Sequence, residues 1–284
     1  MRCPTSARSA LALVAAALVA GCASLSEPVG PPRKETLLAV TDAGELIRVN
    51  AGQPQRVLSR QALQGLPAGE TLAGIDFRVA RGVLYALSSG GRLYTLDATS
   101  AALKPVGSAP AIALPGRVHG VDFNPVADRV RVVGDGGLNL RLHPDTGALA
   151  ATDPALQYAA GDAAAGQPPR VAGAGYTYNK KDDKRTTNYA IDLARGTLVT
   201  QGTHEDAVPA VSPNTGQLFT VGALGTGALE NASFDIADTD NTALAAVQRA
   251  GHTRLVLVNL ATGRATDLGR LADGRGVRGI AIEP

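Results

Sequence analysis

The chain has 284 residues, of which 45% are hydrophobic and 18% are charged, and its formal net charge at pH 7 is +2. This composition is typical of a folded globular protein and excludes a long disordered chain. Both signs of charge are scattered along the sequence, which excludes the basic patch that a nucleic-acid partner requires.

The amino-terminal segment predicts export from the cytoplasm. Residues 1–8 contain two Arg, and residues 9–20 form an almost unbroken hydrophobic run. The run is too short to cross a bilayer as a helix, and it has the length of the hydrophobic region of a signal peptide. We therefore expect residues 1–21 to be a signal peptide, residues 22–35 to be a flexible tether, and residues 36–284 to form a single domain.

The hydrophobic run ends in LVAGC (18–22), which resembles a bacterial lipobox. The resemblance implies that Cys22 is lipidated and that several acyl chains hold the protein stably in a membrane. Ala23 follows Cys22 where an inner-membrane retention signal has Asp. The resemblance therefore implies an outer-membrane lipoprotein that faces the periplasm, with exposure at the cell surface left open. A plain secretory peptide cleaved near Ala23 is the alternative.

Short hydrophobic segments separated by turn-forming residues recur through the rest of the chain, and each segment has the length and composition of a β-strand. The clearest unit spans residues 72–107 and contains four segments. Units of four strands that repeat every 40–50 residues or so are typical of a β-propeller. The four segments are 72–77, 83–87, 92–97 and 103–107.

We count five such units and therefore predict an all-β propeller with five four-stranded blades. The first unit has only three amino-terminal strands, and the strand at 277–283 is expected to complete it and so close the ring. Residues 153–169 are interpreted as a loop between blades. Six blades are the alternative, because the hairpin at 213–216 can be assigned differently. The units cover residues 37–59, 72–107, 117–151, 172–222 and 231–269.

The stretch HGVDFNPVADRVRVVGDGGLNLRLHPDTGALAATD (119–153) resembles the domain of unknown function 4394 family. The segments LAGIDFRVARGVLYAL, YAIDLARGTLVTQG and RGIAIEP resemble it as well, so the resemblance covers about residues 37–284. It implies a bacterial, usually exported, propeller-like protein and carries no established activity.

The third unit differs from the others because polar residues alternate with hydrophobic ones on its strands. Alternate side chains point to the same face of a strand, so these residues are expected to form one polar face that is partly buried against the next blade. We expect Asp122 to accept hydrogen bonds from Arg129 or Arg131, since an unpaired buried charge is costly. A network that joins two blades is favoured, and a site for an anion or a sugar is the alternative. The residues are Asp122, Asn124, Arg129, Arg131, Asn139 and Arg141.

Asp76, Asp122 and Asp235 occupy equivalent positions in the first strands of three units. A ring of carboxylates near the central channel could bind calcium, which requires several oxygen ligands. The equivalent positions in the other units are Gly175 and Ala281, which break the ring. Capping of backbone amides between blades is therefore favoured, no cofactor is predicted, and calcium remains the alternative.

The sequence contains no recognised catalytic set. It lacks a GxSxG nucleophile motif and a phosphate-binding loop, and its four His form no zinc pattern. The charged stretch NKKDDKRT (179–186) is interpreted as a solvated loop tip. The expected function is a non-catalytic binding or assembly platform, whose partners are the membrane and a protein or glycan. The alternative is a propeller hydrolase or lyase that acts on a sugar or lactone with a metal at the channel mouth.

Overall fold

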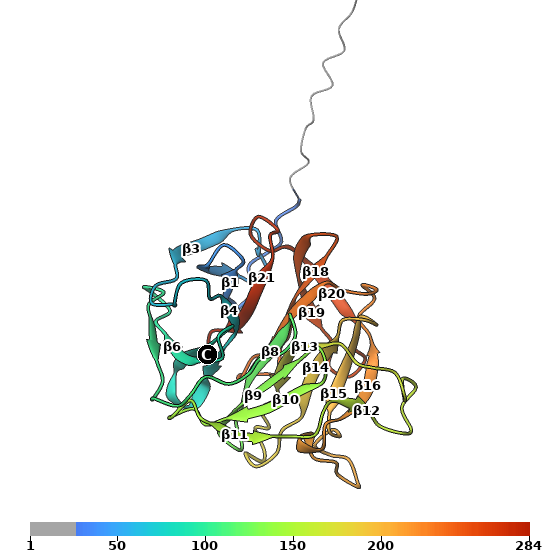
Figure 1. Ribbon diagram of the computed structural model, residues 1–284. Coiled ribbons are helices and arrows are strands. Elements are labelled where there is room, and N and C mark those ends of the chain that lie inside the picture. Colours follow the sequence, from blue (N-terminus) through green and yellow to red (C-terminus); the bar gives the residue numbers. More distant parts are fainter. Residues whose placement is uncertain (1–26) are drawn as a thin grey trace, which may run out of the picture.

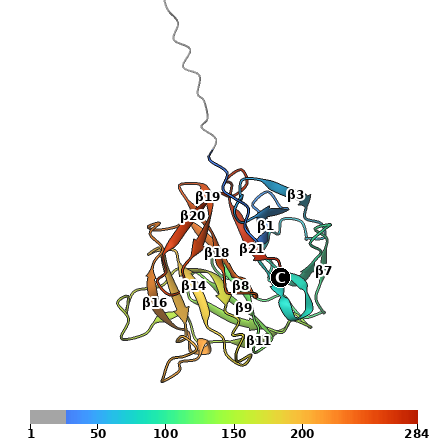
Figure 2. The same ribbon diagram turned by 180° about the vertical axis from the view of Figure 1, so that it is seen from behind.

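The computed structural model describes residues 27–284, which form a ring of five β-sheets, antiparallel except for one short strand, around the central axis that the channel of a propeller follows (Figures 1 and 2). The predicted five-bladed propeller is therefore confirmed, and the six-bladed alternative is wrong. The predicted signal peptide, 1–21, and Cys22 lie outside the described residues. No helix among the described residues is long and hydrophobic enough to cross a membrane.

From the channel outward, blade 1 contains β21 (Val277–Ile282), β1 (Thr36–Thr41), β2 (Glu45–Asn50) and β3 (Val57–Ala62). In the same direction, blade 2 contains β4 (Leu72–Arg78), β5 (Val83–Ser88), β6 (Leu93–Leu96) and β7 (Leu103–Pro105), with the 3-10 helix η1 (Val79–Arg81) between β4 and β5. Blade 3 contains β8 (His119–Asn124), β9 (Arg129–Gly134), β10 (Leu138–Leu142) and β11 (Leu149–Thr152).

The last two blades follow the same order. Blade 4 contains β13 (Val171–Tyr176), β14 (Asn188–Asp192), β15 (Thr197–Gln201), β16 (Gln217–Ala223) and β12 (Gln157–Tyr158), with the 3-10 helix η2 (Pro213–Thr215) before β16. Blade 5 contains β17 (Asn231–Ile236), β18 (Ala243–Arg249), β19 (His252–Val258) and β20 (Ala265–Arg270).

The ring is closed by the two ends of the described chain. Strand β21 pairs antiparallel with β1, and Leu37 lies opposite Ile282. This confirms the predicted closure, which leaves no open seam between the first and last blades. Within the part of the chain predicted to be a loop, 153–169, Gln157 and Tyr158 instead form β12, which pairs parallel with β16 and adds a fifth strand to blade 4.

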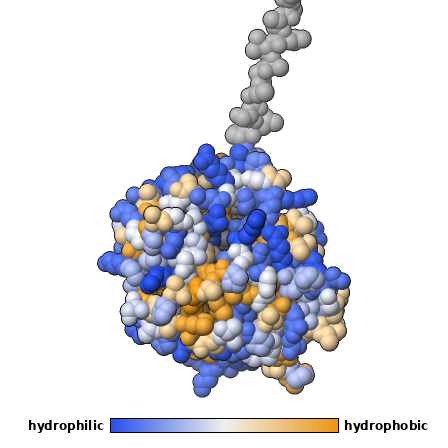
Figure 3. All heavy atoms as spheres, in the orientation of Figure 1, coloured by the Kyte–Doolittle hydropathy of each residue, from blue (hydrophilic) through white to orange (hydrophobic). Residues whose placement is uncertain are grey.

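The hydrophobic core lies between neighbouring blades, because both faces of each sheet are covered. The inner strand β13 is buried at all six positions, whereas the outer strands β3, β11 and β20 are largely exposed. Between blades 2 and 3, the rings of Tyr85 and Phe123 meet edge to face with centroids 5.0 Å apart. Figure 3 shows that hydrophilic residues cover most of one face of the molecule and that hydrophobic residues gather in one patch.

Neighbouring inner strands approach closely at Gly120 in β8. A Cβ atom at this position would lie 2.5 Å from the carbonyl carbon of Gly173 and 2.7 Å from the amide nitrogen of Ala174 in β13. We expect Gly120→Ala to lower the free energy of unfolding by about 1–3 kcal/mol, because the backbone of β13 must move. Urea unfolding measures the change. Gly161→Ala is the control, since a Cβ there meets no atom within 4 Å; equal effects of the two substitutions would contradict the prediction.

Residues 27–35, the described part of the predicted tether, lie against blades 1 and 5. The side chain of Asn50 accepts a hydrogen bond from the amide of Arg33 at 2.9 Å and donates one to its carbonyl oxygen at 2.7 Å. Glu27 forms an ion pair with Arg254 at 2.7 Å, and Lys34 pairs with Asp240. This segment is thus held along the surface where the ring closes.

Candidate functional site

The polar residues predicted in the third unit lie together on the face of blade 3 that meets blade 4. Arg131 in β9 is directly opposite Asp122 in β8 and Arg141 in β10, and Asn124 is opposite Arg129. Side chains of directly opposite residues share a face of the sheet. The expected polar face is therefore present in the structure.

Arg131 is the centre of a buried hydrogen-bond network that joins blades 3 and 4, with only 1% of its surface exposed. Within blade 3, its Nη1 atom donates to Asn139 at 2.7 Å and to Asp153 at 2.6 Å. Across the interface, its Nε atom donates to the hydroxyl of Tyr176 at 3.2 Å and its Nη2 atom to Asn214 at 2.6 Å. These contacts come from four separate segments of the chain.

Asp153 is the carboxylate that balances this network. Besides Arg131, it accepts two hydrogen bonds from Arg141, at 2.9 and 2.8 Å. Burial would raise the pKa of Asp153, but the hydrogen bonds from Arg141 and Arg131 outweigh burial and lower the pKa below 3.8. The hydrogen bond to Asp153 is also the main reason that the pKa of Arg141 is raised. The carboxylate of Asp153 thus accepts hydrogen bonds from two guanidinium groups.

The expected pairing of Asp122 with Arg129 or Arg131 is not what the structure shows. Asp122 Oδ2 accepts a hydrogen bond from the backbone amide of Tyr176 at 2.9 Å. The short Asp side chain reaches only the neighbouring inner strand, whereas Arg131 extends outward to Asp153 and Asn214. Arg129 donates to the carbonyl oxygen of Asp128 at 2.8 Å.

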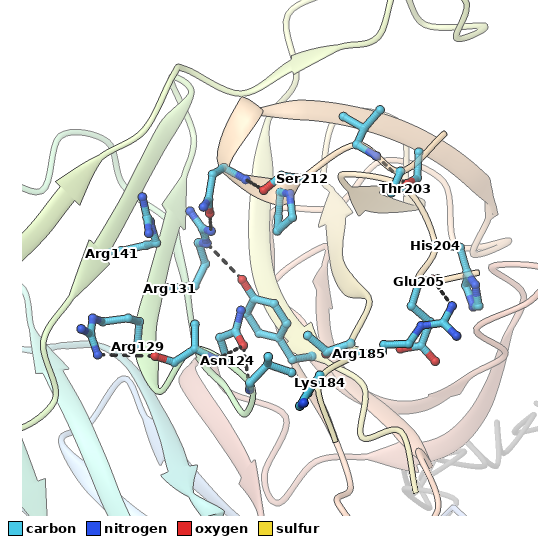
Figure 4. Close-up of a pocket in the computed structure, with 18 residues that line it drawn as sticks. Asn124, Arg129, Arg131, Arg141, Lys184, Arg185, Thr203, His204, Glu205 and Ser212 are labelled. Atoms are coloured by element: carbon cyan, nitrogen blue, oxygen red, sulfur yellow. Dashed lines mark hydrogen bonds between the residues drawn. The ribbon is translucent and has the colours of Figure 1, made fainter. Parts of the chain in front are cut away.

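A cavity of about 420 Å³ opens beside this network, between blades 3 and 4 (Figure 4). We call it the first cavity. Its blade 3 wall carries the arginines of β9 and β10, and its other walls come from the loop before β14 and the segment between β15 and β16. The polar residues that line it are Asn124, Arg129, Arg131, Arg141, Tyr176, Lys184, Arg185, Thr186, Thr203, His204, Glu205, Ser212 and Asn214.

Positive charge dominates the first cavity. Among the described residues, no carboxylate forms an ion pair with Arg129 or with the exposed Lys184, whereas Arg185 pairs with Asp206 at 2.6 Å. Glu205 is the one carboxylate among the lining residues. Free guanidinium and ammonium donors at the mouth of a cavity can bind carboxylate, sulfate or phosphate groups.

The three equivalent aspartates meet near the central channel. Each is buried, and oxygen atoms of Asp76, Asp122 and Asp235 lie within 4.8 Å of one another. Each carboxylate also accepts a hydrogen bond from the inner strand of the next blade around the ring. The pairs are Asp76 with the Phe123 amide at 2.7 Å, Asp122 with the Tyr176 amide at 2.9 Å, and Asp235 with the Ile282 amide at 2.5 Å.

Burial shifts the titration of all three groups upward. Burial and then the charge of Asp235 raise the pKa of Asp76, and burial and then the charge of Asp76 raise the pKa of Asp122. Burial raises the pKa of Asp235 to about 6. The three oxygens are the described atoms best placed to hold a cation. Their backbone hydrogen bonds support the favoured interpretation, in which they cap amides between blades.

The family model of a domain of unknown function (DUF4394) matches residues 45–281, which is most of the chain. The chain belongs to the DUF4394 family. A comparison with curated proteins found no match.

The DUF4394 propeller is also similar to solved structures at low sequence identity. It is 13% identical to a chain of the nidogen/laminin complex, over 88% of this chain and 98% of that one, with a TM-score of 0.46. It is 14% identical to Myxococcus xanthus glutaminyl cyclase, over 77% of this chain and 84% of that one, with a TM-score of 0.47.

Sequence reasoning missed several residues at this site of the DUF4394 propeller. The loop at 179–186, interpreted as a solvated tip, supplies Lys184 and Arg185 to the first cavity. Asp153 falls in the segment predicted to be a loop, and Asn214 falls in η2. The one available signal was that the stretch resembling the family ends at Asp153.

Proposed function

We propose that this protein is an exported binding protein that holds an anionic ligand in the first cavity. The observation that supports this is the excess of cations there, where Arg129 and Lys184 have no carboxylate partner among the described residues. Arg131 and Arg141, held in place by Asp153, form the rigid wall beside them. A preorganised arginine wall lowers the entropic cost of binding.

The binding test uses inorganic sulfate as the probe and isothermal titration calorimetry as the measurement. We expect Arg129→Gln combined with Lys184→Met to weaken sulfate binding about tenfold or more, since each hydrogen bond to a charged group contributes about 1.5–3 kcal/mol. Arg92→Gln, an exposed arginine in blade 2, is the matched control and should leave binding unchanged. Equal binding by the wild type and the double variant would show that the anion does not bind here.

The cellular location of the protein is the second part of the proposal. We propose that Cys22 is lipidated, that the propeller is anchored to the outer membrane facing the periplasm, and that it acts there as a binding or assembly platform without catalysis. The LVAGC sequence (18–22) after a hydrophobic run supports this. Replacing Cys22 with Ala is expected to abolish palmitate labelling and to release the protein from the membrane fraction; unchanged labelling and fractionation would refute the lipid anchor.

A hydrolase or lyase that acts on a sugar or lactone is the second candidate. The observation that favours it is the meeting of Asp76, Asp122 and Asp235 within 4.8 Å at the channel. Thermal unfolding with calcium and then with EDTA separates the two candidates. A large calcium-dependent rise in melting temperature that EDTA reverses would favour the metal-dependent enzyme.

A further inference from the structure

A second cavity of about 700 Å³ lies between blades 4 and 5, next to the first. The segment Thr203–Glu205, labelled in Figure 4 among the residues of the first cavity, also lines the second and therefore lies between the two. The other walls come from strands β14, β15 and β16 of blade 4 and from the loops that contain Asn241 and Leu260 in blade 5.

Three side chains of blade 4 form one row across this cavity. Tyr189 in β14 lies directly opposite Thr200 in β15, and Thr200 lies directly opposite Phe219 in β16. Because directly opposite residues share a face of a sheet, all three point toward blade 5. Tyr189 is only 3% exposed and Thr200 only 5%, whereas Phe219 is half-buried.

Three polar atoms at the second cavity, on Tyr189, Thr200 and Glu205, have no hydrogen-bond partner in the described part of the protein. Among the described residues, no hydrogen bond joins the hydroxyl of Tyr189 or Thr200 to another group, and neither hydroxyl oxygen is fully buried, so both are accessible from the cavity. Glu205 Oε1 accepts a hydrogen bond from Asn179 at 3.0 Å, whereas its Oε2 atom is buried without a partner. Buried polar groups are nearly always hydrogen-bonded, and the unpartnered Glu205 oxygen lies beside two accessible hydroxyls that also have no protein partner. The cavity therefore has hydrogen-bonding capacity that a bound molecule can use.

The chemistry of the second cavity selects the class of that molecule. Burial, followed by the nearby charge of Glu205, raises the pKa of Tyr189 to about 12, so its hydroxyl remains able to donate. The two hydroxyls and the carboxylate oxygen can together donate to and accept from neighbouring hydroxyl groups. Phe219, Val221 and Leu260 give the same cavity a hydrophobic side. A sugar ring has both a set of hydroxyl groups and a hydrophobic face of C–H groups.

We infer that the second cavity binds a sugar ring, and that the ligand of this protein is an acidic oligosaccharide. Its anionic group occupies the first cavity and a neutral ring occupies the second, on either side of Thr203–Glu205. The acidic part of this inference rests on the proposed function, whereas the sugar ring rests on the second cavity alone. Two linked contacts bind together more tightly than either contact alone, because the second is intramolecular.

The experiment compares inorganic sulfate, a panel of neutral disaccharides and the same disaccharides carrying one uronate, by isothermal titration calorimetry. We expect a uronate disaccharide to bind at least about tenfold more tightly than sulfate or its neutral counterpart. Tyr189→Phe and Thr200→Val, which each remove one unpartnered hydroxyl, should weaken both disaccharides about tenfold and leave sulfate unchanged. Tyr94→Phe, at a buried tyrosine of blade 2, is the matched control.

Each outcome tests either the sugar site in the second cavity or the anion site in the first. If no disaccharide binds, or if Tyr189→Phe and Thr200→Val leave disaccharide binding unchanged, the sugar site is refuted. The sulfate arm reports on the proposed function separately, through Arg129→Gln with Lys184→Met. If that double variant leaves uronate and sulfate binding unchanged while Tyr189→Phe weakens binding of the neutral disaccharide, the result refutes the anion site in the first cavity and supports the sugar site in the second. Thermal unfolding of every variant confirms that the fold is retained.

Discussion

Replacing Arg131 with Ala is expected to lower the free energy of unfolding by about 3–5 kcal/mol, the usual cost of removing one partner of a buried ion pair. The substitution removes the donor to Tyr176 and Asn214, whereas Asn139 keeps its hydrogen bond from Gln201. Asp153 keeps its hydrogen bonds with Arg141, so the loss arises mainly at the interface between blades 3 and 4. Urea unfolding followed by circular dichroism measures the change.

Arg129→Ala is the control for this prediction. Arg129 lies two residues earlier on the same strand, at the rim, where it donates only to backbone carbonyl oxygens. Its removal should change the free energy of unfolding by less than about 0.5 kcal/mol, as for most surface substitutions. If Arg131→Ala were equally mild, the network would be a binding wall with little structural role.

The stability of the propeller is expected to fall as the pH rises from 4 to 7, because of the channel aspartates. The pKa of Asp235 is raised from 3.8 to about 6 by burial. Below 3.8 both the folded and unfolded states hold this proton, and between 3.8 and 6 only the folded state does, so stability is lost across that interval. At about 1.4 kcal/mol per pKa unit, Asp235 alone accounts for about 3 kcal/mol. The raised pKa values of Asp76 and Asp122 add to the same trend.

Urea unfolding at a series of pH values from 4 to 8 measures this trend. Aspartates with a lowered pKa, such as Asp153, lose their contribution only below their ordinary value of 3.8, outside this range. Glu27 and Glu35, whose ordinary value is 4.5, lose theirs only at the acidic end of the range. Asp122→Asn should flatten the dependence, because its amide oxygen can still accept from Tyr176 and the substitution removes a carboxyl group whose pKa is raised. Asp183→Asn, in an exposed loop, should leave the slope unchanged. Stability that rises with pH across this range would contradict the prediction.

The blades could be predicted from sequence because their determinants are local. Turn residues and hydrophobic runs mark each strand, and the match between VRGIAIE (277–283) and the other inner strands indicated the closure by β21. Strand β12 could not be predicted, since it has two residues and forms only through parallel pairing with β16, far along the chain. Pairings of that kind leave no local pattern.

The candidate site was predictable only in part, for a similar reason. Alternation along β8, β9 and β10 places Arg131 and Arg141 on one face, which needs no knowledge of the neighbouring blade. Predicting the partners of these arginines does require knowledge of the neighbouring blade, because Asn214 is 83 residues away from Arg131 in sequence. The predicted pairing of Asp122 with an arginine failed because the distance from its short side chain to the backbone of blade 4 decides its partner.

The position of the first cavity on the ring has a practical consequence. In the order of the inner strands, β21, β4, β8, β13 and β17, the junction of β8 and β13 lies across the channel from β21, where both ends of the described chain are held (Figures 1 and 2). The first described residue, Glu27, is held at blade 5 by Arg254, so a tag or sensor chip attached through it joins the ring away from the junction of β8 and β13. A ligand can reach Arg129 and Lys184 while the protein stays immobilised.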